Sequence, residues 1–366
     1  MNNKLKKIII ATGGTGGHVF PAYSLAKHFH DNKINVQIIT DKRGFKYLQD
    51  YSDIKVIKIA SATIFKKNIF KLLFSSFIIL YSILRSFIFL LGSRPNLVFG
   101  MGGYSSFPVC IAAKILRIPF IIYENNLHIG KANRFLLPYA KKVFVSYKEL
   151  GGVAEKHLEK ICEIGNIIRK EILNFNVHPD FNQSERKLKI LILGGSQAAK
   201  IFGEQIPKIV EKCVASKIPI KIFQQCLPSQ NKFLENTYKN LKIDFEIFNF
   251  SKNILHYFSK TDIAITRSGS SMLAELFNSN IPFISVPLPT SADNHQLKNA
   301  VYYEKNRYSY LVEEKDLNEK LFQLINQIND NRSILLEIMN RQRQFSDKLV
   351  YENIDFQINQ WINEKY

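Results

Sequence analysis

Residues 8–22 read IIIATGGTGGHVFPA. Three isoleucines precede four glycines, which fall within five positions, and His18 follows with a segment of helical spacing. Glycines between a buried strand and a helix let backbone N–H groups approach a ligand closely, and the positive end of the helix favours negative charge. The stretch therefore predicts a strand–loop–helix unit that suits a phosphate group.

The same alternation of short apolar runs and helix-length segments continues along the 366 residues. It predicts βαβ units with parallel sheets. Strands are expected at residues 7–11, 35–40, 54–59, 96–100, 119–123, 143–146, 188–193, 220–223, 244–248, 262–266 and 282–286. The rhythm restarts near residue 188 after a polar stretch, so two Rossmann-like domains are expected, with a boundary within 164–187.

Two more glycine-rich loops follow expected strands: GMGGYSSFP at 100–108 and LGGSQAAK at 193–200. Neither the G-x-G-x-x-G spacing nor the Gly-Lys-Ser/Thr ending of a P-loop is present. One such loop is weak evidence, because tight turns need glycine in any case. Three loops across two domains predict two phosphate-bearing ligands in an interdomain cleft.

A fourth polar element spans residues 262–300. Ser270 is a natural N-cap for a helix that could also bind phosphate, and Glu275 lies about one turn further, where it could reach sugar hydroxyls. Asp293, His295, Gln296 and Asn299 cluster at another expected helix start. Each of these side chains could instead be an ordinary polar residue of a solvent-exposed loop.

His18 has two interpretations. An imidazole at a helix start can take the proton from an attacking hydroxyl near neutral pH, which makes it a candidate general base. It could instead cap the helix or bind a phosphate oxygen.

Metal and disulfide chemistry find little support in the sequence. There is no HExxH and no Asp-x-Asp, and His28 and His30 lie two apart on an expected helix and so face different ways. The four cysteines are scattered, which favours reduced thiols of a cytosolic protein. The basic N-terminus, MNNKLKKIII, is expected to lead into the first strand and not to be a signal peptide.

The charge is uneven. Residues 1–165 hold 24 lysines and arginines against 9 acidic residues, a net +15 of the total +19. This half is expected to face something anionic, either nucleic acid or a membrane surface. Residues 64–93 are strongly apolar, but Lys71 and Arg85 leave at most 13 uncharged residues between them, too few for a span of about 20. The segment is either a buried helix or, as we favour, one that rests on an anionic membrane, rimmed by Lys66, Lys67, Lys71 and Arg85.

The motifs GGTGGHVFPA, GMGGYSSFP, GGSQ, RSGSSMLAE and HQLKNA, in this order over residues 8–300, resemble the MurG-type glycosyltransferases of family 28. The resemblance implies a GT-B fold: α/β, with two Rossmann-like domains whose parallel sheets face an interdomain cleft. It implies metal-independent, inverting transfer of N-acetylglucosamine from UDP-GlcNAc to C4 of the muramic acid in undecaprenyl-diphosphate-linked lipid I. This peptidoglycan reaction, which serves cell shape and division, would take place on the cytoplasmic face of the inner membrane.

The resemblance also assigns residues. His18 and Glu124 would be catalytic. The donor would contact Thr15, Gly16, Gly17, Asn126, Arg169, Ser196, Ser251, Ser270, Ser271, Met272, Leu273, Ala274, Glu275 and Gln296. The acceptor diphosphate would contact Gly14, Gly102, Gly103 and Tyr104. No cofactor, metal or nucleic acid is expected; the anionic membrane surface is an expected partner, and other cell-wall or division proteins could be further ones.

The expected domains are 1–164 for the acceptor and the membrane and 165–345 for UDP-GlcNAc, with a C-terminal helix at 346–366 packing back on the first domain. Two departures from the family pattern stand out: Tyr123 and Asn125 replace a usual His and Gln, and Ala198 replaces a glycine. The alternatives are a UDP-GlcNAc 2-epimerase, a glycolipid synthase with another acceptor, or a non-catalytic nucleotide-sugar-binding scaffold on the membrane.

Overall fold

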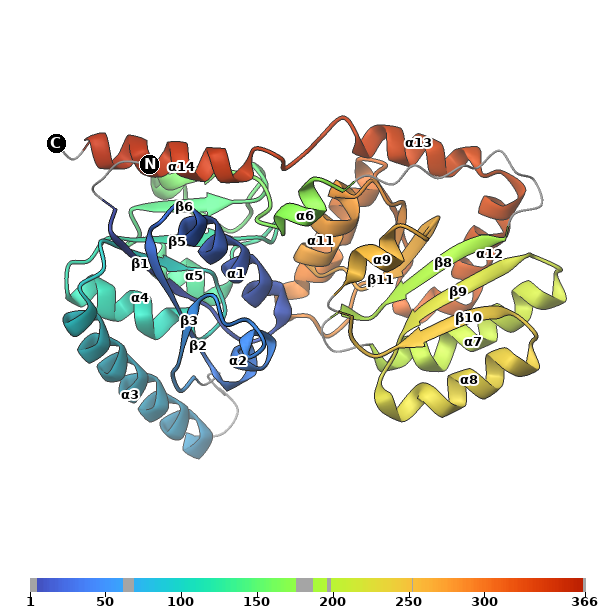
Figure 1. Ribbon diagram of the computed structural model, residues 1–366, viewed down its shortest axis with the longest axis horizontal. Helices are drawn as coiled ribbons and strands as arrows, with labels where there is room; N and C mark the ends of the chain where they lie inside the picture. Colours follow the sequence, from blue (N-terminus) through green and yellow to red (C-terminus); the bar gives the residue numbers. More distant parts are fainter. Residues whose placement is uncertain (1–4, 62–68, 176–186, 196–198, 252, 365–366) are drawn as a thin grey trace. The chain divides into compact units, whose positions relative to one another are not determined.

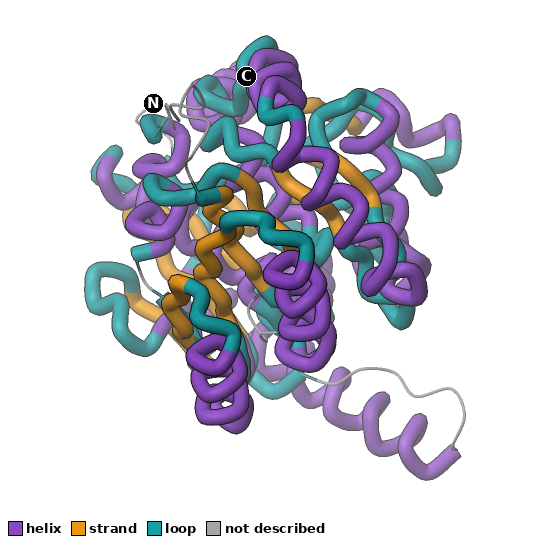
Figure 2. The backbone as a smooth tube through the Cα atoms, turned by 90° about the vertical axis from the view of Figure 1, so that its right-hand side faces the viewer, coloured by secondary structure: helices purple, strands orange, loops and turns teal. Residues whose placement is uncertain are grey.

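A computed structural model describes residues 5–61, 69–175, 187–195, 199–251 and 253–364 (Figure 1). The chain divides into two compact units: residues 1–169 with 347–366, and residues 170–346. In both, strands are covered by helices, as expected for α/β domains (Figure 2).

Unit 1 contains, among its described residues, a seven-stranded parallel sheet in the order β3-β2-β1-β4-β5-β6-β7. Its strands are β1 (Lys7–Ala11), β2 (Asn35–Thr40), β3 (Lys55–Lys58), β4 (Leu97–Gly100), β5 (Phe120–Glu124), β6 (Lys142–Val145) and β7 (Ile161–Glu163). Its helices are α1 (Gly16–Asp31), α2 (Lys42–Leu48), α3 (Ile69–Ser93), α4 (Ser106–Ile115), α5 (Lys131–Leu136) and α14 (Val350–Glu364). The interior strand β1 places Ile10 opposite Ile38 on one side and Phe99 on the other.

Unit 2 contains, within the described part of the chain, a six-stranded parallel sheet in the order β10-β9-β8-β11-β12-β13. Its strands are β8 (Leu188–Leu193), β9 (Ile220–Gln225), β10 (Asp244–Phe248), β11 (Ile263–Thr266), β12 (Phe283–Ser285) and β13 (Tyr310–Leu311). Its helices are α6 (Lys170–Leu173), α7 (Lys200–Ala215), α8 (Asn231–Asn240), α9 (Ile254–Phe258), α10 (Ser270–Asn278), α11 (His295–Lys305), α12 (Leu317–Asp330) and α13 (Ser333–Gln342). Ile192, Phe202 and Ile265 belong to its buried core.

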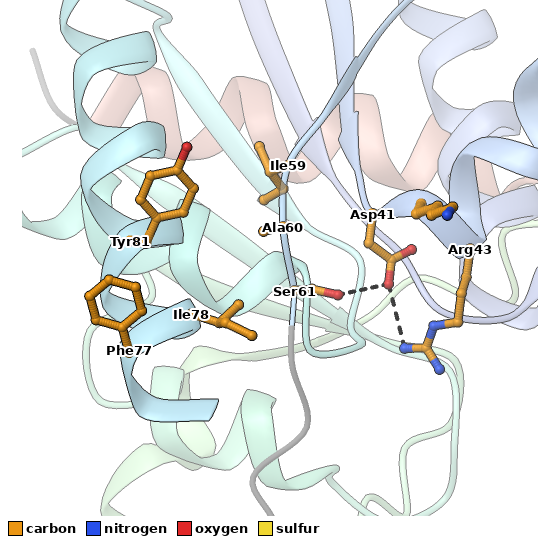
Figure 3. Close-up of a pocket in the computed structure, with 9 residues that line it drawn as sticks. Asp41, Arg43, Ile59, Ala60, Ser61, Phe77, Ile78 and Tyr81 are labelled. Carbon is orange, nitrogen blue, oxygen red and sulfur yellow. Dashed lines mark hydrogen bonds and ion pairs between the residues drawn. The ribbon is translucent and has the colours of Figure 1, made fainter. Parts of the chain in front are cut away.

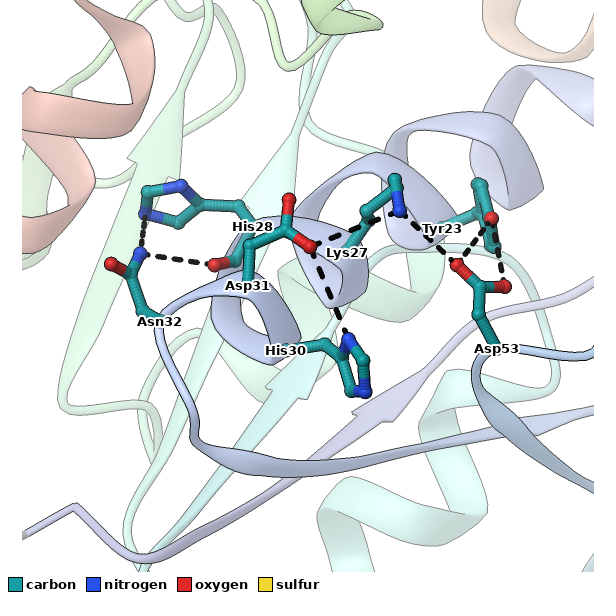
Figure 4. A network of polar contacts seen from close by, with 7 residues as sticks. All are labelled: Tyr23, Lys27, His28, His30, Asp31, Asn32 and Asp53. Atoms are coloured by element: carbon teal, nitrogen blue, oxygen red, sulfur yellow. Dashed lines mark hydrogen bonds and ion pairs between the residues drawn. The ribbon is translucent and has the colours of Figure 1, made fainter.

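His28 and His30 of α1 do face different ways, as their spacing predicts. His28 is buried, and its Nε2 lies 3.0 Å from Asp355 of α14, while its ring stacks on Tyr351 at 4.7 Å. His30 is half-exposed and lies 4.0 Å from Asp31 on the outer face, where Tyr23 and Lys27 also bind Asp53 (Figure 4). His28 is therefore part of the packing of α14 within unit 1.

No disulfide is formed among the described cysteines, which include all four.

Helix α3 differs from the other helices of unit 1 because most of its apolar surface is exposed. Ser75, Ser82, Ser86 and Leu90 form its buried face, and Ser82 donates to the Ala60 carbonyl at 2.7 Å. Most of the rest is exposed and apolar. By length and composition alone, the 21 residues from Leu73 to Ser93 could cross a membrane, which corrects our expectation that Lys71 and Arg85 leave too short a run. Only 22% of this stretch is buried, so it is not a core helix.

Candidate active site

The first and second glycine loops touch each other at the carboxyl ends of the neighbouring strands β1 and β4. Gly14, Gly102 and Gly103 all have positive φ, at 86°, 80° and 76°. A side chain on Gly13 would collide with Ser105, and a Cβ on Gly103 would lie 2.8 Å from the Gly13 carbonyl oxygen. These glycines are thus required both by the backbone conformation and by the close approach of the two loops.

His18 lies in the first turn of α1, beside the second loop. A Cβ on Gly102 would sit 3.0 Å from the imidazole ring, so the ring lies directly against that glycine. The His18 carbonyl accepts a hydrogen bond from Thr12 at 3.0 Å, which fixes the start of the helix to the end of β1. Thr15, in an extended conformation, is the N-cap residue, and Gly16 begins the helix. The imidazole and the N-terminal N–H groups of α1 therefore meet at one edge of the sheet, while Tyr104 of the second loop is exposed.

The loop that follows β5 is joined to the first glycine loop by a hydrogen bond that the sequence did not predict. Pro21 has no N–H, so the Gly17 carbonyl lacks its usual partner within α1. The Asn125 side chain donates to this carbonyl at 3.1 Å. A proline six residues into a helix was the available signal that an external donor is needed, but the sequence does not say which residue supplies it.

Glu124 is buried at the end of β5 and organises its own turn. Its carboxylate accepts hydrogen bonds from Gly130 N–H at 2.9 Å, Asn133 at 3.0 Å and the Asn126 side chain at 2.9 Å. A carboxylate that accepts hydrogen bonds from a backbone N–H and two side-chain amides of its own turn is better suited to positioning a loop than to moving a proton. We therefore expect Glu124 to act as a positioning residue, with Asn126 beside it.

Tyr123, which stands where the family usually has histidine, points into the core. Its hydroxyl lies 2.8 Å from Ser146 Oγ and accepts from Ile167 N–H at 3.0 Å. Burial raises the pKa of the Tyr123 hydroxyl well above its ordinary value, despite these bonds. This departure from the family pattern therefore concerns packing within unit 1.

Asp41 was not anticipated as part of the site. It is the N-cap residue of α2, and its buried carboxylate accepts from Gly44 N–H at 2.7 Å, Gly14 N–H at 3.2 Å and Ser61 Oγ at 2.8 Å. Burial opposes ionisation, but these bonds and the nearby Arg43 charge outweigh it and hold the pKa of Asp41 below its ordinary value. The Gly14 N–H is thus already occupied by a carboxylate, which leaves the N–H groups of the α1 start as the better phosphate donors.

Asp41→Asn tests this anchor. Because the folded-state pKa lies below the unfolded one, ionised Asp41 stabilises unit 1 above the unfolded pKa, and this contribution is lost as pH falls through the folded pKa. We expect the asparagine variant to lower the free energy of unfolding at pH 7 by about 1.5–3 kcal/mol, the cost of charge-assisted bonds, with the difference shrinking in acid. Urea unfolding at pH 7 and at about pH 2.5, well below the ordinary Asp pKa of about 3.9, measures it. Asp31→Asn, at an exposed ion pair, is the matched control; equal stability of Asp41→Asn and wild type at pH 7 would contradict the anchor.

Unit 2 presents its loops at the carboxyl ends of β8 and β11, which are also neighbours. Gly195 has a positive φ of 76°, and Gly194 N–H donates to the Gln225 side chain at 3.1 Å. Ser196 and Ala198 lie outside the described residues. The expectation that Ser270 is an N-cap is wrong: Gly269, extended at φ −69° and ψ 129°, is the cap residue, and Ser270 is the first residue of α10.

The remaining donor candidates of unit 2 lie around this helix. Glu275 is buried in the second turn of α10, after Ser271, Met272, Leu273 and Ala274. The cluster expected at 293–299 divides in two: Asn299 donates to the Ser268 carbonyl at 3.2 Å, and Gln296 accepts from Leu288 N–H at 2.9 Å. Asn299 therefore holds the loop that precedes α10, and Gln296 holds the loop that follows β12. Ser251 follows β10, and Arg169 is the last residue of the first segment of unit 1.

Among the described residues, no group of three or more His, Cys, Asp or Glu side chains is arranged to hold an ion.

Two parallel sheets, each with glycine or serine loops at the carboxyl ends of neighbouring strands, define an α/β protein of the GT-B type. Residues 8–145 match the glycosyltransferase family 28 N-terminal domain, and residues 189–354 match the family 28 C-terminal domain. The chain belongs to glycosyltransferase family 28.

Relatives in sequence agree with this assignment, and solved structures share the fold. The chain is 35% identical, over 98% of its length and 99% of the relative, to the UDP-N-acetylglucosamine–N-acetylmuramyl-(pentapeptide) pyrophosphoryl-undecaprenol N-acetylglucosamine transferase of Pelagibacter ubique. It is 36% identical to the protein of the same name from Rickettsia bellii, over 88% and 91%. Acinetobacter baumannii MurG has a similar fold, with a TM-score of 0.76 at 23% identity over 97% and 99% of the two chains. The UDP-GlcNAc 2-epimerase of Neisseria meningitidis shares the fold at a TM-score of 0.65 and 14% identity, over 97% and 100%.

Proposed function

We propose that the chain transfers N-acetylglucosamine from UDP-GlcNAc to the C4 hydroxyl of the muramic acid of lipid I, giving lipid II and UDP. Curated relatives with this activity in their names match nearly the whole chain. The observation that carries the mechanism is the His18 imidazole, which lies against the second glycine loop at the start of α1.

In this reaction the acceptor oxygen attacks C1 of the donor sugar. The O4–C1 bond forms as the bond from C1 to the diphosphate oxygen breaks, and its electron pair leaves with UDP. His18 takes the proton from the attacking hydroxyl, because an imidazole can do so near neutral pH. The N-terminal N–H groups of α10 stabilise the negative charge that develops on the departing diphosphate.

The product distinguishes this function from the alternatives. Purified protein is incubated with UDP-GlcNAc, with and without lipid I, and the products are identified by mass spectrometry. The proposal expects lipid II and UDP, both dependent on lipid I. Formation of UDP-N-acetylmannosamine without an acceptor would favour a 2-epimerase instead, and unchanged donor in both mixtures would favour a non-catalytic binding protein.

We further propose that α3 holds the protein on the cytoplasmic face of the inner membrane as a peripheral protein. Large apolar side chains are exposed along the helix, at Leu73, Phe74, Phe77, Leu80, Tyr81, Leu84, Ile88 and Leu91. Ile115, Phe135 and Tyr139 of the neighbouring α4 and α5 region are also exposed. A large exposed apolar patch marks an interaction surface. Since the opposite face of α3 is packed on unit 1, lying on the bilayer keeps contacts that crossing it would break; Lys66 and Lys67 of the expected rim lie outside the described residues.

Leu84→Glu with Ile88→Glu tests the attachment. Each apolar side chain that enters the bilayer contributes roughly 1.5–3 kcal/mol, so two charges should weaken binding to anionic vesicles at least tenfold. Co-sedimentation with phosphatidylglycerol-containing vesicles measures this binding, which high salt should also weaken through screening. Glu159→Gln is a control variant away from α3. If neither the double variant nor high salt changed vesicle binding, the proposal that α3 attaches the protein to the membrane would be wrong.

A further inference from the structure

A hollow of about 420 Å³ lies between α2 and α3 in unit 1, where β2 and β3 end. Its wall on the α2 side is polar and charged, formed by Asp41, Lys42 and Arg43. Its wall on the α3 side is apolar, formed by Phe77, Ile78 and Tyr81. Residues 59–61 run between the two (Figure 3). The volume falls within the range of small-molecule sites, about 300–1,000 Å³.

Hydrogen bonds hold the two walls in place. Ser61 donates to Asp41 at 2.8 Å, which ties the middle segment to α2. Ser82 donates to the Ala60 carbonyl at 2.7 Å, which ties the same segment to α3. The hollow is therefore a built feature of unit 1.

The charged end of the hollow adjoins the first glycine loop. Asp41 accepts from Gly14 N–H at 3.2 Å, so the loop and the hollow share one carboxylate. A Cβ on Gly14 would lie 3.9 Å from the Arg43 guanidinium, which places this cation beside the glycine loop. Lys42 and Arg43 exceed the single Asp41 charge, so this end favours an anion.

The apolar end continues onto the exposed face of α3. Phe77 and Tyr81 line the hollow and are themselves 68% and 47% exposed, so a chain that leaves the hollow along them remains on an apolar surface. A nucleotide sugar would leave this wall without polar partners. An anion joined to a hydrocarbon chain matches both ends.

We propose that this hollow binds the lipid end of the acceptor, with Lys42 and Arg43 facing the diphosphate and Ile78 with its neighbours contacting the first isoprenoid units. The inference rests on the proposed function, which supplies an isoprenoid diphosphate as the substrate class. It makes Arg43 and Ile78 specificity residues for the acceptor, although neither belongs to a glycine loop.

Direct binding tests the hollow without turnover. Farnesyl diphosphate and inorganic diphosphate are titrated into the full chain by calorimetry in detergent-free buffer. Wild type should bind farnesyl diphosphate at least tenfold more tightly than inorganic diphosphate. Ile78→Glu should abolish this preference and leave diphosphate affinity unchanged, and the milder Ile78→Ala should reduce it about threefold. Arg43→Gln should weaken both ligands about tenfold.

Leu80→Glu is the matched control, because Leu80 is exposed on α3 but does not line the hollow. It should bind both ligands as wild type does. Equal affinity of wild type for the two ligands, or equal losses in Leu80→Glu and Ile78→Glu, would overturn the proposal. This binding needs no donor sugar, so it is tested separately from the transfer reaction. A protein that shows these binding effects but makes no lipid II would support the lipid site and refute the proposed function. A protein that makes lipid II but shows none of these binding effects would support the function and refute the lipid site.

Discussion

His18→Ala is expected to reduce kcat by about 10²–10⁴-fold, the range for loss of a general base. The imidazole lies against Gly102 in the first turn of α1, so truncation removes the proton acceptor and leaves both glycine loops in place. Binding of UDP-GlcNAc should stay within about twofold of wild type, since the donor contacts we propose lie largely in unit 2. Steady-state kinetics with saturating lipid I, together with calorimetric titration of the donor, measures both quantities.

His18→Asn separates the two interpretations of this residue. An amide can position a hydroxyl or bind a phosphate oxygen, but it cannot accept the proton, so this variant should be nearly as slow as the alanine variant. Near-normal turnover by the asparagine variant would show that His18 is not the base.

Glu275→Ala is expected to lower kcat/KM for UDP-GlcNAc about ten- to a hundredfold. Loss of charge-assisted hydrogen bonds to the ribose hydroxyls would cost about 1.5–3 kcal/mol. Glu275 is buried in the second turn of α10, so Glu275→Gln is measured beside it, because glutamine keeps the volume and removes the charge. Glu304→Gln, at an exposed position of α11, should behave as wild type. An unchanged kcat/KM in a folded Glu275→Ala protein would end the assignment.

Much of the fold could be predicted because buried parallel strands are short, nearly continuous apolar runs. Every strand expected from the sequence is present within two residues of its expected bounds. The strands that were missed, Ile161–Glu163 and Tyr310–Leu311, lie at sheet edges and are too short for an apolar run to reveal them.

The site was predictable only in part. Glycine loops can be recognised in the sequence because positive φ and close backbone contact require glycine. His18 could be predicted because it stands next to the first of these loops in the sequence. The hydrogen bonds from Asn125 to the Gly17 carbonyl and from Gly14 N–H to Asp41 join residues that are 108 and 27 positions apart, and only the sheet order brings them together. Ser270 misled because serine favours the N-cap in general, whereas here the extended Gly269 takes that position.

The linkage in the product tests the central claim most directly. UDP-GlcNAc carries an α-linked sugar, so a single displacement at C1 by the muramic acid C4 hydroxyl must give a β-(1→4) bond. Two-dimensional NMR of the product made from UDP-[¹³C]GlcNAc and lipid I reports both the anomeric configuration and the attached carbon. The account predicts a β-anomeric signal correlated with C4 of the muramic acid. An α linkage, attachment at another carbon, or label recovered as a mannosamine derivative would contradict it.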